Sequence, residues 1–362
     1  MSPMTAMEFQ RGRREMPALS WEENMLNRLT KLALGLALPI ALLASGPAMA
    51  EIREHSLKFA AANNKGHPQV MGMEKFAELV KEKSGGKIEV KLFPGGVLGG
   101  DVQTVSALQG GVIEMTVLNA GILASNVKQF GAVDLPFLFN SGEEADKVMD
   151  GAFGTSLMKL LPDTGLVGLA YWELGFRNLT NNRHAVTKLE DIKGLKIRTI
   201  QSPIPIELFN SLGANAVPLP YTELYTALET GTVDGQENPA ANIINAKFFE
   251  VQKYMTVTRH QYNPQIVLIS KKFWDGLNDE EKAVFEAAAT EARDYQRKVS
   301  RELDAKAIEE IKKTGMEVAE LSPEETQKLR DAVKPLVDKF AAQIGADTVT
   351  QLFKELDTVR GK

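Results

Sequence analysis

The residue best suited to bind an anion ends a short apolar segment in the second half of the chain. Arg198 closes the segment LKIR (residues 195–198), which has the pattern of a buried strand. If that strand belongs to a parallel sheet, Arg198 lies at its carboxyl edge, where open α/β folds bind ligands. A guanidinium there can grip a carboxylate through two parallel hydrogen bonds. A solvated surface arginine is the alternative, because most arginines are exposed.

A polar cluster follows at residues 234–239 (DGQENP), and its density of acids and amides is uncommon in a connecting loop. Asn238 could orient a ligand oxygen, whereas Asp234 and Glu237 are better suited to brace the loop. Turn chemistry is the alternative, since Asp-Gly forms turns and Asn-Pro begins them. Arg177 is a further candidate for an anion, with an ion pair between lobes or at the surface as its alternative.

Aromatic residues could wall a pocket near these groups, although aromatics at helical or strand spacing usually belong to the core. Trp172 and Tyr221 are the candidates we retain. The chain has no Cys, which excludes thiolate chemistry, and its 4 His lie far apart without metal spacing, so any metal site would need carboxylates. No HExxH, GxSxG or SxxK motif brings a nucleophile to a base. We therefore predict no catalytic residue, no cofactor and no metal.

The elements that must position these residues alternate between strands and helices. In the first half, strand patterns at residues 56–62, 87–93 and 113–118 enclose helical patterns at residues 68–83 and 101–108. A second series has strands at residues 195–198 and 214–217, with helices at residues 203–212 and 222–230. This order predicts parallel pairing in open α/β sheets.

Connections between the two series are expected downstream. Two apolar strands, at residues 254–258 and 265–270, should carry the chain back toward the first lobe. Asn278 and Glu281 form a capping box, and Asp279–Lys313 then has no Pro or Gly, which predicts a helix about 52 Å long. Since a lobe is only about 40 Å across, we expect this helix to bridge both lobes. A surface or coiled-coil helix is the alternative, but no heptad repeat is sustained.

Length and composition agree with a two-lobed globular protein. The chain has 362 residues, of which 44% are hydrophobic and 25% charged. Its 42 basic and 47 acidic residues give a net charge of -5, and no basic block could neutralise a nucleic acid backbone. DNA and RNA are therefore not expected partners.

The N-terminus has the pattern of a secretory signal. Arg28 and Lys31 precede an apolar run at residues 32–44, and Ala48-Met49-Ala50 is a small-x-small cleavage site. The run is too short for a membrane anchor, which needs about 18 residues or more. We predict cleavage after Ala50, which makes residues 1–50 an N-terminal extension and signal peptide, and export to the periplasm. Because Met25 by itself begins a complete signal, the true start is expected there.

Several segments together resemble the DctP-type substrate-binding proteins of tripartite ATP-independent periplasmic (TRAP) transporters. The resemblance runs through nearly the whole chain after residue 50 and is carried by GFRNLTNN (175–182), GLKIRT (194–199), PYTELYTAL (220–228), VDGQENP (233–239) and FFEVQKY (248–254). It implies two α/β lobes joined by strands and a long helix, which close on a small organic anion. The anion is then handed to a membrane permease driven by a sodium gradient.

The resemblance also implies roles for individual residues. Arg198 matches the family's carboxylate-binding arginine, and Asn238 matches its ligand-binding asparagine. Arg177 matches a second arginine found in members that bind bulkier acids. Tyr221 falls where an aromatic residue lines the pocket, and Asn119 falls on a pocket position of the first lobe. At the end of the first strand, Ala62 and Asn63 offer little polarity where some relatives contact ligand.

These observations predict a periplasmic protein that captures a small carboxylate, such as a sugar acid, between two lobes. We expect residues 51–174 and 264–303 in lobe I, residues 175–263 and 304–362 in lobe II, and a monomer that delivers its ligand to the permease. An exported hydrolase or lyase with Arg198 as a substrate clamp is one alternative. A ligand-sensing partner of a receptor kinase is another.

Overall fold

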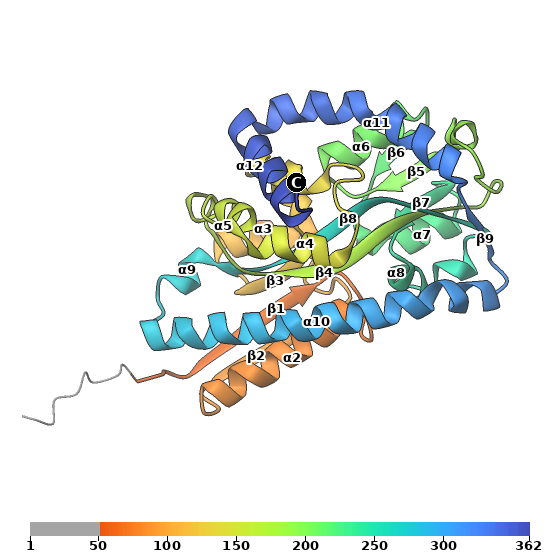
Figure 1. The fold of residues 1–362 in the computed structure, drawn as a ribbon. Coiled ribbons are helices and arrows are strands. Elements are labelled where there is room, and N and C mark those ends of the chain that lie inside the picture. The colour runs from red at the N-terminus through yellow and green to blue at the C-terminus, as the bar shows by residue number, and fades with distance from the viewer. Residues whose placement is uncertain (1–50) are drawn as a thin grey trace, which may run out of the picture. The chain divides into compact units, whose positions relative to one another are not determined.

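The computed structural model describes residues 51–362, so the predicted signal peptide at residues 1–50 lies outside the described residues. Within this range, nine strands form one mixed sheet in the order β2-β1-β3-β8-β4-β7-β5-β6, with β9 beside β8 (Figure 1). The strands are β1 (His55–Ala61), β2 (Ile88–Phe93), β3 (Met115–Asn119), β4 (Leu166–Asn181), β5 (Lys196–Thr199), β6 (Asn215–Pro218), β7 (Gly235–Asn238), β8 (Tyr254–Ser270) and β9 (Glu317–Glu320).

Two groups of three parallel strands lie toward opposite ends of the sheet. β1 pairs in parallel with β2 and β3, and β5 pairs in parallel with β6 and β7. Helices connect the strands within each group, as the alternating sequence pattern predicts, and the two-lobed α/β fold class is confirmed. These helices are α2 (Pro68–Lys83), α3 (Asp101–Gly110), α6 (Pro203–Ser211) and α7 (Leu224–Glu229), with α8 (Ala240–Asn245) after β7.

Two long antiparallel strands, β4 and β8, join the groups. β4 has 16 residues and β8 has 17, and they pair along most of their length. The sequence analysis expected two separate strands where β8 is continuous, because polar residues interrupt the apolar pattern there. That prediction was wrong. His260, Gln261 and Asn263 are buried in the middle of β8 and find hydrogen-bond partners inside the protein.

Strand β7 corrects a second expectation. Residues 234–239 were predicted to form a polar loop, but Gly235–Asn238 is a fully buried strand between β4 and β5. Polar residues are tolerated there because neighbouring strands supply partners: Arg177 donates to Glu237, and Gln236 donates to Thr180. The polar density is therefore a buried hydrogen-bond network rather than a surface turn.

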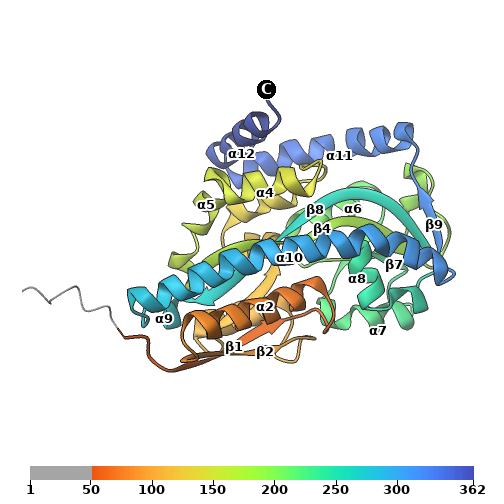
Figure 2. The ribbon, with the colours of Figure 1, turned by 60° about the horizontal axis from the view of Figure 1, so that its bottom comes forward.

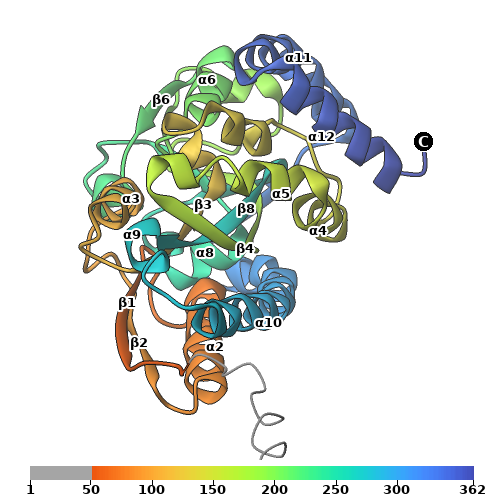
Figure 3. The same cartoon turned by 90° about the vertical axis from the view of Figure 1, so that its left-hand side faces the viewer.

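Helices cover both faces of the sheet (Figure 3). α2 and α10 (Asp279–Lys313) lie on one face, over an apolar cluster that includes Leu57, Phe59 and Phe285. The opposite face packs against a larger cluster that includes Phe130 and Phe153. The helices on that side include α4 (Gly142–Asp150), α5 (Ala152–Met158), α11 (Pro323–Ile344) and α12 (Ala346–Val359).

The helix α10 spans both strand groups. It has the predicted 35 residues and lies beside α2 of the first group and α8 of the second (Figure 2). Its capping box is present: the backbone amide of Glu281 donates to Asn278 Oδ1, and that of Asn278 donates to Glu281 Oε2, each at 2.9 Å. The prediction of a long bridging helix is confirmed.

Candidate ligand-binding site

A cavity lies where the ends of several strands meet between the two strand groups. Four of the six predicted site residues line it: Asn119, Arg198, Tyr221 and Asn238. Their positions follow from the topology, since Asn119 ends β3, Arg198 lies near the end of β5 and Asn238 ends β7. Further polar residues complete the lining: Asn63, Gln69, Asp101, Gln201, Asn242 and Gln265.

Arg198 brings a buried positive charge to this cavity. Its side chain is 2% exposed, and Nε and Nη2 donate to the carbonyl oxygen of Leu219 at 2.9 and 2.7 Å. Nη1 is buried and has no partner among the described residues. Burial, with the nearby charge of Arg177, lowers the pKa of Arg198 to about 10, so the group stays charged at neutral pH. A buried cation with a free donor is stabilised by an anion.

Tyr221 lies beside this guanidinium, with the Arg198 Cζ 5.9 Å from its ring centroid. Burial raises the pKa of Tyr221 to about 12, which keeps the phenol neutral. Asn242 is a hydrogen-bond neighbour of its buried hydroxyl, which has no acceptor among residues 51–362. The phenol and the Nη1 group are therefore two donors without acceptors on the same side of the cavity. Together they match the two oxygens of one carboxylate.

Arg177 does not line the cavity. It is fully buried on β4, with Nη2 2.7 Å from Glu237 Oε1 and Nη1 2.7 Å from Asn263 Oδ1, and its Nε also contacts the Glu237 carboxylate. Burial alone would raise the pKa of Glu237, but Arg177 and His260 outweigh it and hold the pKa at about 2. The charge of Arg177 is thus already matched inside the protein, which differs from its expected contact with ligand.

Trp172 is the other predicted site residue that the structure places elsewhere. Its side chain is 1% exposed and packs in the apolar cluster under α2 and α10, with its ring 6.3 Å from that of Phe59. A Cβ added at Gly72 would lie 2.8 Å from the indole, so the helix passes directly over it. Successive side chains of β4 point to opposite faces of the sheet, and the side chain of Trp172 points to the core that helix α10 covers rather than to the cavity.

Several lining residues were missed or undervalued from the sequence. Asn63 was read as offering little polarity, yet it lines the cavity and donates to Gln69 Oε1 at 2.8 Å. Gln265 had a usable signal, since a lone amide in an apolar strand implies a buried partner, and it pairs across the sheet with Asn119. Asn242 lies on α8 after the polar cluster and had no such signal.

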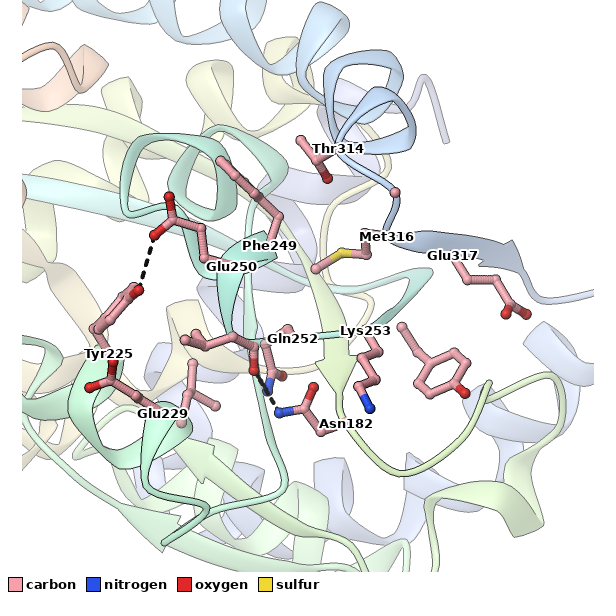
Figure 4. Close-up of a pocket in the computed structure, with 14 residues that line it drawn as sticks. Asn182, Tyr225, Glu229, Phe249, Glu250, Gln252, Lys253, Thr314, Met316 and Glu317 are labelled. Atoms are coloured by element: carbon pink, nitrogen blue, oxygen red, sulfur yellow. Dashed lines mark hydrogen bonds between the residues drawn. The ribbon is translucent and has the colours of Figure 1, made fainter.

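A larger groove of about 710 Å³ lies between α7, the start of β8 and the segment after α10 (Figure 4). Its charged lining residues are the carboxylates Glu229, Glu250 and Glu317 and the single amine of Lys253. Tyr225, which also lines it, donates to Glu250 Oε2 at 3.0 Å. An anion is better matched by Arg198, so the smaller cavity is the candidate ligand site.

Residues 51–362 contain neither a metal-binding cluster nor a membrane-spanning helix. No group of three or more His, Asp or Glu side chains in this part of the chain could hold a metal ion. In the same residues, no helix combines the length and the apolar character needed to cross a membrane.

The sequence of the chain is similar to those of known proteins. Residues 59–343 match the family described as bacterial extracellular solute-binding protein, family 7 (DctP). The 2,3-diketo-L-gulonate-binding periplasmic protein YiaO of Escherichia coli is 38% identical over 308 residues, which cover 84% of this chain and 92% of that protein.

Solved structures are similar as well. A TRAP periplasmic solute-binding protein of Ochrobactrum anthropi, with its C-terminus bound in the ligand-binding pocket, is 81% identical. Its TM-score is 0.77, over 86% of this chain and 97% of that one. The sugar acid binding protein DctPAm of Advenella mimigardefordensis, in complex with galactonate, is 43% identical. Its TM-score is 0.84, over 85% and 99%.

Proposed function

The chain belongs to family 7 of the bacterial extracellular solute-binding proteins, the DctP family, and we propose that it captures its ligand, a small organic acid anion, through Arg198. The buried Nη1 group of Arg198, with no partner among the described residues, is the observation that carries this proposal. A carboxylate placed there would satisfy that donor and compensate the buried charge. Delivery to the membrane subunits of a TRAP permease then completes the function, as in the solute-binding proteins of this family.

The remaining site residues take distinct roles in this proposal. Tyr221 donates to the same carboxylate as Arg198, while Asn238 and Asn119 contact the rest of the ligand from the two sides of the cavity. Arg177 acts through Glu237, which precedes Asn238 on β7, and so positions the site without touching the ligand. Trp172 supports the core behind it.

Capture involves closure of two lobes, residues 51–174 with 264–303 and residues 175–263 with 304–362. The pairing of β4 with β8 has a register shift between Glu173 and Gly175, opposite Pro264 and Asn263, at these same boundaries. A bulge interrupts the ladder and gives the strands a place to bend. The cavity encloses only about 30 Å³, so a ligand larger than a few waters enters when the lobes separate.

The protein works outside the cytoplasm in this proposal. A signal peptide ending at Ala50 directs export to the periplasm, and the monomer carries the ligand to the permease. The name of the Escherichia coli relative, a periplasmic protein, supports this location. The polar groups that line the cavity, apart from Asp101, are amides, a phenol and a guanidinium. They suit recognition rather than hydrolysis, so the protein returns its ligand unchanged.

Equilibrium binding with a panel of organic acids tests this function. Purified protein (residues 51–362) is titrated by calorimetry with aldonates, uronates, C4-dicarboxylates and 2-oxo acids, and the bound compound is recovered and analysed by mass spectrometry. We expect at least one acid to bind and to be recovered without chemical change. Recovery of a converted product would favour the enzyme alternative, and no binding by any acid would contradict the proposal.

A further inference from the structure

We propose that the cavity selects a monocarboxylate that bears hydroxyl groups along its chain, and that it rejects a second carboxylate. The inference rests on the proposed function and adds the class of ligand. It comes from hydrogen-bond chains that fix which atoms of the lining amides face the ligand. The lining presents the donors Arg198 and Tyr221 together with oxygen acceptors that lack donors.

The first chain fixes the orientation of Asn242. Gln69 Nε2 lies 3.2 Å from the carbonyl oxygen of Val117, which can only accept, so Gln69 must donate there. Gln69 Oε1 then accepts from Asn63 Nδ2 at 2.8 Å, and Asn63 Oδ1 accepts from Asn242 Nδ2 at 3.1 Å. Asn242 Oδ1 remains, and His67 supplies a donor for it inside the protein: His67 Nδ1 accepts from Gln69, so its Nε2 carries the proton, and its side chain hydrogen-bonds Asn242. This oxygen is therefore not among the acceptors left for the ligand.

A second chain fixes Asn238 in the same way. Gln252 Nε2 donates to the carbonyl oxygen of Val251 at 3.0 Å, so Gln252 Oε1 accepts from the Thr180 hydroxyl at 2.8 Å. Thr180 accepts from Gln236 Nε2 at 2.9 Å, and Gln236 Oε1 accepts from Asn238 Nδ2 at 2.5 Å. Asn238 thus also turns its Oδ1 atom away from the chain as an acceptor.

Asp101 adds a carboxylate to the same lining. It is the first residue of α3; Thr104 donates to its backbone carbonyl, but within residues 51–362 no side chain donates a hydrogen bond to its carboxylate. A ligand hydroxyl can donate to this carboxylate and to Asn238 Oδ1. A second ligand carboxylate has no proton to donate at neutral pH and would meet two oxygen acceptors, one of them charged.

The donors left in the lining match one carboxylate. They are Arg198 Nη1 and the Tyr221 hydroxyl, which are buried and have no acceptor among the described residues. Asn119 and Gln265 contribute unpartnered carbonyl oxygens, but no backbone group fixes their amides, so each can turn to donate or accept. The ligand that satisfies all of these groups has one carboxylate and several hydroxyls.

Two matched pairs of acids test the selection. D-erythronate and meso-tartrate, and D-galactonate and galactarate, differ only in whether the far end is a hydroxymethyl group or a carboxylate. Calorimetry is done at pH 8, where Asp101 is ionised, since burial raises its pKa to about 6. In at least one pair we expect the monocarboxylate to bind at least ~100-fold more tightly, because a like charge in a desolvated site costs several kcal/mol.

Asp101→Asn separates the selection from general effects of mutation. This variant should lower the ratio of monocarboxylate to dicarboxylate affinity by at least ~10-fold, mainly because it binds the dicarboxylate more tightly than the parent does. Asp163→Asn, which removes an exposed acid far from the lining, is the matched control and should leave the preference unchanged.

Three outcomes are distinguishable. A dicarboxylate that binds as tightly as its partner overturns the inference but leaves the proposed function intact, and so does a preference that Asp101→Asn does not alter. Absence of binding by all four compounds and by every other acid of the panel overturns both. An unfolded Asp101→Asn variant, recognised by circular dichroism, is replaced by Asp101→Ser, for which the same reduction is expected.

Discussion

Arg177 and Glu237 form an ion pair that is fully buried between neighbouring strands, with Arg177 Nη2 2.7 Å from Glu237 Oε1. Glu237 is followed by Asn238, which lines the candidate cavity, so the pair holds the strand that carries this proposed ligand contact. The same guanidinium donates to Asn263, whose amide donates to Asp134 at 3.2 Å. This network ties β7, β4 and β8 together behind the site.

Arg177→Met should therefore lower stability as its main effect. Removing one partner of a buried ion pair leaves the other charge unpaired, which costs about 3 to 5 kcal/mol. Urea unfolding at pH 7 measures the free energy of unfolding, and the double variant Arg177→Met/Glu237→Gln should recover part of the loss. If Arg177→Met keeps its stability and loses only affinity, Arg177 contacts the ligand directly, as the sequence analysis expected.

His67 should make stability depend on pH. It caps α2, where its Nδ1 accepts from the backbone amide of Gln69 at 3.1 Å, and burial lowers its pKa to about 4. The unfolded chain binds a proton below about 6.5 whereas the folded protein does not, so stability is lost as pH falls from 6.5 toward 4. Between pH 7.5 and 4.5 this loss amounts to roughly 2.5 kcal/mol.

His67→Asn isolates that contribution, because asparagine also caps a helix but does not titrate. Chemical unfolding of both proteins across the pH range should show the parent losing its advantage over the variant by the stated amount. Parallel stability curves would mean that His67 is protonated in the folded protein as readily as in the unfolded chain.

Gly96 should be needed for closure of the cleft. It has φ +70°, and a Cβ atom there would lie 2.2 Å from Cγ2 of Thr222, a residue adjacent to Tyr221 in the site. Gly96→Ala should hold the two sides apart and weaken ligand binding at least ~10-fold, because only the closed population binds tightly. Gly86→Ala is the matched control: Gly86 has φ +84° but nothing within 4 Å of its added Cβ.

Both alanine variants carry the strain of a left-handed backbone, about 1 to 2 kcal/mol, so their stabilities should fall together. Their affinities, measured by calorimetry, should differ. Equal affinities would show that the loop around Gly96 does not limit closure.

Local patterns predicted much of the fold. The periodicity of residues 68–83 and the capping box at Asn278 each depend on neighbours within a few positions, and both helices begin and end as expected. The continuity of β8 could not be predicted this way, since its buried polar residues are satisfied by partners such as Asp134, which is 127 residues from Gln261.

In the candidate site, too, residues marked by local patterns could be predicted, and those that depend on long-range contacts could not. Arg198 and Asn238 could be proposed because the ends of parallel strands converge at one edge of a sheet. The chain of amides from Gln69 through Asn63 to Asn242 joins residues up to 179 positions apart, so no spacing rule reveals it. Trp172 was misplaced because the sequence does not tell which face of β4 the helices cover.

Calorimetry on Arg198 variants tests the central claim most directly. The parent, Arg198→Ala and Arg198→Lys are titrated with the tightest-binding acid of the panel, after unfolding curves confirm that each variant folds. Arg198→Ala should weaken binding by roughly 10² to 10⁴, the equivalent of about 3 to 5 kcal/mol, and Arg198→Lys should recover only part of that loss because an ammonium lacks the planar fork. If Arg198→Ala binds the acid as tightly as the parent does, the carboxylate is held elsewhere and this account of the site is wrong.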